Sequence, residues 1–134
     1  MKMRSPSVLA AAALALALAA GGAQAQMPEG DATRGQDVFK KCTACHAVEE
    51  GKHKVGPSLH GVVGRQAGST DFARYVGLKG TDIVWTEENL FEYLADPTAF
   101  IKSKTQNPRS GMAYKLPKPE ERADVIAYLK TLTN

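Results

Sequence analysis

Cysteine is scarce in this sequence. Its 134 residues contain two cysteines, Cys42 and Cys45. A disulfide between such close neighbours would close a loop of a few residues and would constrain the unfolded chain very little. A fold stabilised by a framework of disulfides is therefore excluded. Two cysteines at this spacing more often hold a chemical group.

Long apolar runs are almost absent. The one candidate, residues 8–20, is shorter than the roughly 20 apolar residues that span a bilayer. Two basic residues precede it, and a small-x-small sequence at residues 23–25 follows, as in a signal peptide. An uncleaved membrane anchor is the alternative, and the short run disfavours it. We predict that residues 1–25 are a cleaved signal peptide and that residues 26–134 form one exported domain, with a bacterial periplasm as the best location.

A strong excess of charge is also missing. The chain has 17 Lys and Arg residues against 14 Asp and Glu residues. Loss of the two basic residues in the signal peptide would lower the net charge from +3 to about +1. A nucleic-acid-binding domain would show a clustered basic excess, so we expect no nucleic-acid partner.

Sustained alternation of apolar and polar residues, the pattern of strands, is lacking too, and the best short strand candidate is residues 83–85. Helical signals occur in four segments instead: residues 33–45 after a cap at Asp31, residues 86–96 from Thr86, a short helix from Asp96-Pro97 through Ile101, and residues 119–132 from Pro119. Residues 47–85 show no period, and a loop of that length suggests chain wrapped around a ligand. We predict an all-α fold of about four short helices joined by long loops.

The two cysteines belong to the sequence Cys42-Thr43-Ala44-Cys45-His46, a Cys-x-x-Cys-His motif. This motif is typical of covalent haem attachment, because cysteines three residues apart can reach both vinyl groups of one porphyrin and the adjacent histidine can bind the iron. A thioredoxin-like redox pair would need a strand and helix context that is missing. A structural zinc site would need a fourth ligand, for which only His53 and His60 are near.

Methionine is nearly as scarce as cysteine, and this narrows the choice of a sixth iron ligand. Of four methionines, two lie in the predicted signal peptide and Met27 lies just after it, which leaves Met112. A methionine opposite the histidine raises the reduction potential of the haem. A core methionine is the alternative reading, and His53 and His60 are the rival ligands. We predict that His46 and Met112 are the metal ligands.

These residues resemble the class I cytochromes c, the group of mitochondrial cytochrome c and its small bacterial relatives. The likeness runs from Gly30 to Leu132 and implies the class I cytochrome c fold, wrapped around one covalent haem c. It further implies a helix crossing in which Gly35 and Phe39 meet Val125 and Tyr128. Residues 68–81 match poorly, and residues 101–112 are longer than in the mitochondrial pattern.

The resemblance also implies roles for four further cofactor-binding residues. By this likeness the carbonyl of Pro57 accepts the proton of His46, which fixes the tautomer of the ligand. Arg65 would stabilise a buried propionate, with Trp85 as its hydrogen-bonding partner, and Tyr93 would lie beside the methionine ligand. Without the resemblance, Trp85 and Tyr93 could equally be core aromatic residues.

The predicted function is one-electron transport between redox complexes, with no catalytic residues and no small-molecule substrate. The rival function is a small peroxidase or gas-binding haem protein, which would need an open sixth position and a distal acid–base group. A reaction centre, a terminal oxidase, a nitrogen-oxide reductase and an alcohol dehydrogenase are all compatible partners.

We expect a monomer that docks acidic patches of redox partners through a ring of lysines at one exposed haem edge. An ordinary solvated surface is the alternative interpretation of these lysines. The predicted ring consists of Lys40, Lys41, Lys54, Lys102, Lys104, Lys115 and Lys118.

Overall fold

The computed structural model describes residues 27–107 and 109–133. The predicted signal peptide lies outside these residues. The described chain contains four helices and no strand: α1 (Ala32–Phe39), α2 (Glu87–Ala95), α3 (Pro97–Lys104) and α4 (Pro119–Lys130). This confirms the predicted all-α fold with four short helices. No helix within these ranges has the length and apolarity needed to cross a membrane.

Three of the four helices begin at a predicted side-chain cap. In each, a side-chain oxygen accepts a hydrogen bond from the backbone N–H three residues on, at 2.8 Å in α1, 3.1 Å in α2 and 3.0 Å in α3. These bonds satisfy N–H groups that have no partner within the helix. The capping residues are Asp31, Thr86 and Asp96. Helix α4 has no side-chain cap and begins at Pro119, which has no N–H to satisfy.

Two helices end three or more residues away from their predicted ends. Helix α1 ends at Phe39, and residues 40–45 continue as turns. In these turns a backbone N–H donates to the carbonyl three residues earlier instead of four, as Cys42 does to the Phe39 carbonyl at 2.7 Å. The Cys-x-x-Cys-His motif therefore lies on turns after the helix. Helix α3 continues past Ile101 to Lys104. The strand candidate at residues 83–85 forms only an isolated bridge, between Gln66 and Val84.

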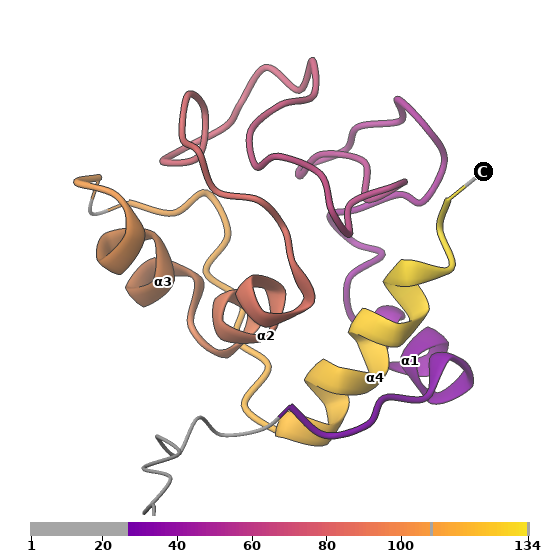
Figure 1. Ribbon diagram of the computed structural model, residues 1–134. Helices are drawn as coiled ribbons and strands as arrows, with labels where there is room; N and C mark the ends of the chain where they lie inside the picture. The colour runs from indigo at the N-terminus through magenta and orange to yellow at the C-terminus, as the bar shows by residue number, and fades with distance from the viewer. Residues whose placement is uncertain (1–26, 108, 134) are drawn as a thin grey trace, which may run out of the picture.

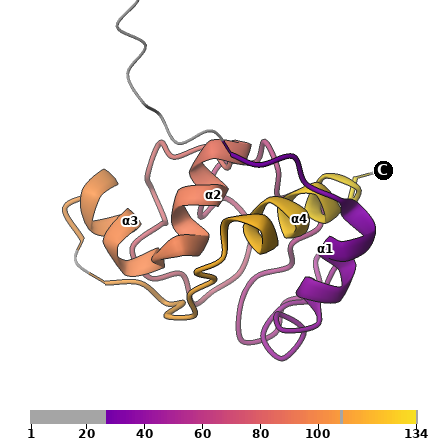
Figure 2. The same ribbon diagram turned by 90° about the horizontal axis from the view of Figure 1, so that it is seen from below.

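The packing centre is the crossing of α1 and α4, which lie side by side in both views (Figures 1 and 2). A Cβ atom on Gly35 would lie 1.9 Å from the Asp124 carbonyl oxygen, so the two backbones are in direct contact there. The rings of Phe39 and Tyr128 pack with centroids 5.3 Å apart. Val125 belongs to the same buried cluster, as the family likeness implies.

The long loop, residues 40–86, passes over the helices and is drawn in magenta to pink in Figure 1. It folds back on itself through backbone bonds of 2.8 Å from Gly64 to Trp85 and from Trp85 to Arg65. The loop thus brings Arg65 and Trp85, which are far apart in the sequence, next to each other. Helices, loop and the segment before α4 surround one cavity.

Candidate functional site

The cavity is half-open and has a volume of about 310 Å³, within the range of about 300–1,000 Å³ found for cofactor sites. Its wall is mainly apolar and comes from α1, α2, α4, the long loop and the segment before α4. Apolar side chains on the wall include Leu59, Phe72, Leu78, Leu116, Val125 and Leu129. Such a wall suits a large apolar group that the four helices cannot replace with core side chains.

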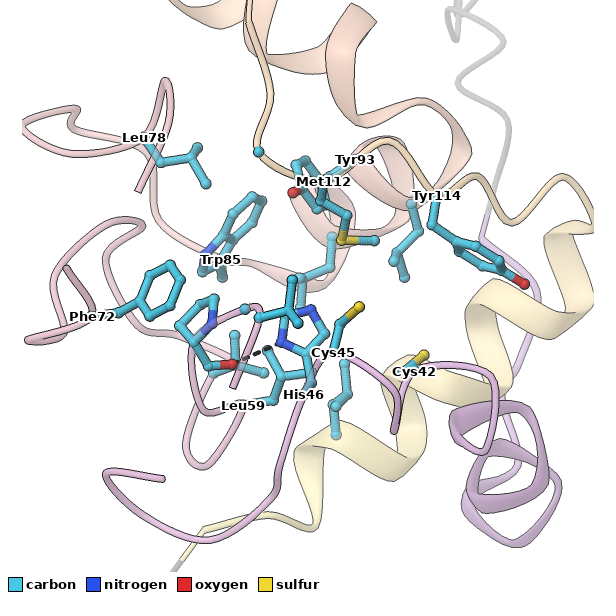
Figure 3. Close-up of a pocket in the computed structure, with 18 of the residues that line it drawn as sticks. Cys42, Cys45, His46, Leu59, Phe72, Leu78, Trp85, Tyr93, Met112 and Tyr114 are labelled. Carbon is cyan, nitrogen blue, oxygen red and sulfur yellow. Dashed lines mark hydrogen bonds between the residues drawn. The ribbon is translucent and has the colours of Figure 1, made fainter. Parts of the chain in front are cut away.

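Both cysteines line this cavity as free thiols. Figure 3 shows Cys42 and Cys45 on the same side of it, next to His46. The turns that replace the end of α1 produce this arrangement, since the N–H of Cys45 donates to the Cys42 carbonyl at 3.1 Å and that of His46 donates to the same carbonyl at 2.9 Å. Burial raises the pKa of the Cys42 thiol.

The ring of His46 is fixed by its neighbours in the loop. Its Nδ1 donates to the Pro57 carbonyl at 2.7 Å, the bond drawn dashed in Figure 3. A carbonyl can only accept, so the proton is on Nδ1 and Nε2 has a free lone pair. Burial lowers the pKa of His46, which favours this neutral form. A Cβ atom on Gly56 would lie 2.3 Å from Cε1 of the ring, so only glycine allows this contact.

Met112 enters the cavity from the wall opposite His46 (Figure 3). It is half-buried, and Ser110 fixes its backbone. The Ser110 Oγ donates to the Met112 carbonyl at 2.6 Å and accepts from the Met112 N–H at 3.2 Å. Sequence reasoning missed Ser110 because nothing in the pattern distinguishes it from an ordinary loop serine.

The two rival histidines lie off the cavity wall. The Nδ1 of His53 accepts from the Ser58 N–H at 3.0 Å, and its Nε2 lies 2.6 Å from the Asp71 carboxylate. His60 has its Nδ1 3.2 Å from the Val48 carbonyl. Both rings therefore make their hydrogen bonds within the long loop. Among the described residues no cluster of three or more His, Cys, Asp or Glu side chains could hold a metal ion, which disfavours the zinc site.

The remaining predicted residues also line the cavity. Arg65 donates to the Ser58 carbonyl at 3.0 Å and to the His60 carbonyl at 2.9 Å, and its burial lowers its pKa. Trp85 and Tyr93 are buried, with ring centroids 4.7 Å apart. Burial raises the pKa of Tyr93 to about 12, so its hydroxyl stays protonated.

The poorly matching stretch, residues 68–81, contributes to the wall as well. Phe72, Arg74 and Tyr75 line the cavity, and the Tyr75 hydroxyl lies 2.5 Å from the Thr70 Oγ. The sequence left the roles of this stretch unassigned because its residues match the family pattern poorly. It closes the side of the cavity that holds Arg65.

The groups present fit a haem. The cavity wall carries two thiols on one side, an imidazole with a free Nε2, a thioether on the opposite wall and the half-buried guanidinium of Arg65, and most of the remaining wall is apolar. The thiols would hold the vinyl-derived carbons, and the imidazole and thioether are the nitrogen and sulfur ligands that iron takes in cytochromes c. The guanidinium suits the carboxylates that a haem carries on one edge.

Comparisons with known proteins agree with this reading. The family model for cytochrome c matches residues 32–133. Cytochrome c2 iso-1 of Rhodospirillum centenum is 44% identical over 119 residues, which cover 79% of this chain and 99% of the relative. Cytochrome c2 of Rhodospirillum rubrum is 45% identical over 115 residues, covering 81% and 85%. The solved structure of cytochrome c2 from Rhodospirillum centenum superposes with a TM-score of 0.71 at 39% identity, covering 78% of this chain and 100% of that one.

The chain therefore belongs to the cytochrome c family, with the class I cytochrome c fold. As a member of this family it is an electron carrier that binds one covalent haem c with its iron.

Proposed function

We propose that His46 and Met112 are the two axial ligands of the haem iron and that this closed site serves single-electron transfer alone. The observation that carries the proposal is their placement on opposite walls of the one cavity that also holds both thiols. Cys42 and Cys45 would attach the vinyl groups. The haem iron supplies the one-electron change between ferric and ferrous states.

The protein's own residues would keep the reorganisation energy of this one-electron change low. Apolar walls exclude water, and two fixed ligands remain on the iron in both states, so little has to move. The Pro57 carbonyl holds the His46 ring in its orientation, and Ser110 holds the backbone of Met112. Burial and the thioether ligand together favour the ferrous state.

The carboxylates of the haem would lie against the polar corner of the cavity. Arg65 supplies a half-buried positive charge there, and the Trp85 indole supplies an N–H donor. Both line the cavity and are tied together by the backbone bonds of the loop. Tyr93 lies on the Met112 side, where its protonated hydroxyl can donate to a group beside the sulfur.

Partner docking would use the open mouth of the cavity, and fewer lysines than predicted are available for it. Four of the seven predicted lysines pair with carboxylates: Lys40 with Asp37, Lys41 with Glu121, Lys104 with Glu92 and Lys115 with Asp96. Lys54 binds the Thr43 carbonyl, and neither Lys54 nor Arg74 on the cavity wall forms an ion pair with a carboxylate of the described residues. Beside them lie exposed Val55, Val76 and Tyr114. We expect this mixed apolar and basic rim to bind acidic patches on redox complexes.

Export as a monomer completes the proposal. The mature chain would begin at Gln26 after removal of residues 1–25. The exported protein would then meet its redox partners in the periplasm. Mass spectrometry of the protein from its native host tests this, because cleavage gives the mass of residues 26–134 plus one haem. A mass that retains residues 1–25 would contradict export by cleavage.

Optical spectra test the ligation. Oxidised and reduced spectra of wild-type protein and of Met112→Ala should show covalent haem in both and a far-red methionine–iron band in the wild type only. Carbon monoxide should bind readily to the reduced variant and poorly to the reduced wild type. A wild type without the band that binds carbon monoxide readily would favour the rival enzyme or gas-binding function.

A further inference from the structure

Arg122 is a buried arginine without a carboxylate partner in the described part of the chain. The residue is 8% exposed and lies in the first half of α4. Its Nε atom is buried without any hydrogen-bonding partner. Burial of a charged group costs free energy that its contacts must offset, so the contacts that Arg122 does make indicate its role.

The charged end of Arg122 holds the chain that follows Met112. Its Nη1 donates to the Leu116 carbonyl at 2.8 Å and to the Pro117 carbonyl at 2.9 Å. These two carbonyls end the ligand segment, residues 109–117, which carries Met112. Hydrogen bonds from an ionised donor are stronger than neutral ones, so Arg122 fixes this end of the segment to α4.

Helix α2 contacts both Arg122 and the ligand segment. The guanidinium of Arg122 lies 4.3 Å above the centroid of the Phe91 ring, in cation–π contact. The N–H of Leu116 donates to the Leu94 carbonyl at 2.8 Å. The ligand segment is thus held between α2 and α4 at a point four residues beyond Met112, where Arg122 touches both helix and segment.

We infer that Arg122 is a positioning residue that keeps the ligand segment closed over the cavity and so sets how readily Met112 leaves the iron. The inference rests on the proposed ligation by Met112. Met112 can withdraw only if the segment moves away, and such an opening would break the two carbonyl bonds of Arg122. Contacts that exist only in the closed state lower the population of the open state.

Imidazole binding to the ferric holoprotein measures that population, because imidazole must displace Met112 and its apparent affinity is proportional to the fraction of open protein. In Arg122→Met, we expect the apparent affinity for imidazole to rise about tenfold, as for the loss of about one net hydrogen bond to a charged group. Amide hydrogen exchange at Leu116 should accelerate in parallel.

Arg34→Met is the matched control. Arg34 also binds a residue of α4, with its Nε 2.9 Å from Asp124, but that contact faces α1 and lies away from the ligand segment. The control should lower global stability and leave the affinity for imidazole within about twofold of wild type. An equal rise in both variants, or none in Arg122→Met, overturns the inference.

If Arg122→Met yields no holoprotein, Phe91→Leu provides a second test. It removes the aromatic face under the guanidinium and retains Arg122, so we expect a rise of about threefold in affinity for imidazole. An unchanged affinity there overturns the inference. Failure of the proposed ligation is a separate result, because the wild type would then lack the methionine–iron band.

Discussion

At two glycine positions this fold leaves no room for a side chain. At Gly35 a Cβ atom would meet the Asp124 carbonyl at 1.9 Å, and at Gly56 it would meet the His46 ring at 2.3 Å. One of these close approaches lies at the crossing of α1 and α4, and the other lies against the ring of His46. Neither requires a positive φ, so space alone selects glycine at these positions.

Gly35→Ala should therefore destabilise the protein although alanine is the better helix former. The helical preference favours alanine by about 1 kcal/mol, whereas forcing backbone apart at a packed crossing costs about 3 kcal/mol. We expect the free energy of unfolding in urea to fall by about 2 kcal/mol. Gly51→Ala is the control, because nothing lies within 4 Å of that position and only its φ of 70° is unfavourable. A Gly35→Ala protein as stable as wild type would contradict the close crossing.

Asp124 should link stability to pH. Its carboxylate accepts from Arg34 and from the Asp31 N–H, and the Arg34 hydrogen bond above all lowers its pKa below the usual 3.8. The stabilisation is then complete above the unfolded-state pKa and is lost as the pH falls through the lower folded-state pKa. In Asp124→Asn, we expect a lower urea midpoint than wild type at pH 7 and a smaller difference near pH 3. A difference that stays constant between these pH values would contradict the linkage.

At the scale of elements, the junction of α2 and α3 depends on one side chain. Asp96 ends α2 and caps α3, where its Oδ1 accepts from the Ala99 N–H at 3.0 Å. The same carboxylate pairs with Lys115 at 2.8 Å and so ties the junction to the ligand segment. This single residue connects two helices with the chain that carries Met112.

Asp96→Ala should cost about 1 kcal/mol of unfolding free energy, mostly through the lost cap, because the ion pair is exposed and contributes little. Thermal unfolding against Asp82→Ala, an exposed aspartate outside any helix, measures the difference. Equal unfolding temperatures in the two variants would show that the cap does not hold the junction.

The four helices could be predicted from the sequence because their signals are local, whereas ligation of the iron by His46 and Met112 stays a prediction. Helix caps, a first-turn proline and a five-residue motif can be recognised in the sequence without knowledge of the fold. The end of α1 was predicted six residues too late, since no breaker residue marks the change to turns after Phe39. Ser110 and Arg122 were missed for a related reason: their roles depend on contacts that only the folded chain brings together.

At the scale of the whole molecule, charge near the cavity mouth should control the rate of electron exchange. Lys54 and Arg74 come from different parts of the long loop and meet where Arg74 donates to the Lys54 carbonyl at 2.7 Å. Within residues 27–107 and 109–133, neither side chain forms an ion pair with a carboxylate. Most of the other predicted lysines are neutralised locally, so we attribute the attraction of anions mainly to this pair.

The double variant Lys54→Gln/Arg74→Gln should react severalfold more slowly than wild type with hexacyanoferrate(II), an anionic one-electron reductant, at low ionic strength. The difference should vanish near 1 M salt, where the Debye length is about 3 Å. Lys130→Gln, which removes a lysine paired with Glu87 away from the cavity, is the control and should react as wild type does. Equal rates for all three proteins at low salt would contradict a basic rim.

An equilibrium redox titration of the wild type beside Met112→His tests whether His46 and Met112 together hold the iron of a one-electron carrier. We expect a single one-electron wave in both proteins and a lower reduction potential in the variant, because nitrogen stabilises the ferrous state less than sulfur does. The same potential in both proteins would contradict ligation by Met112.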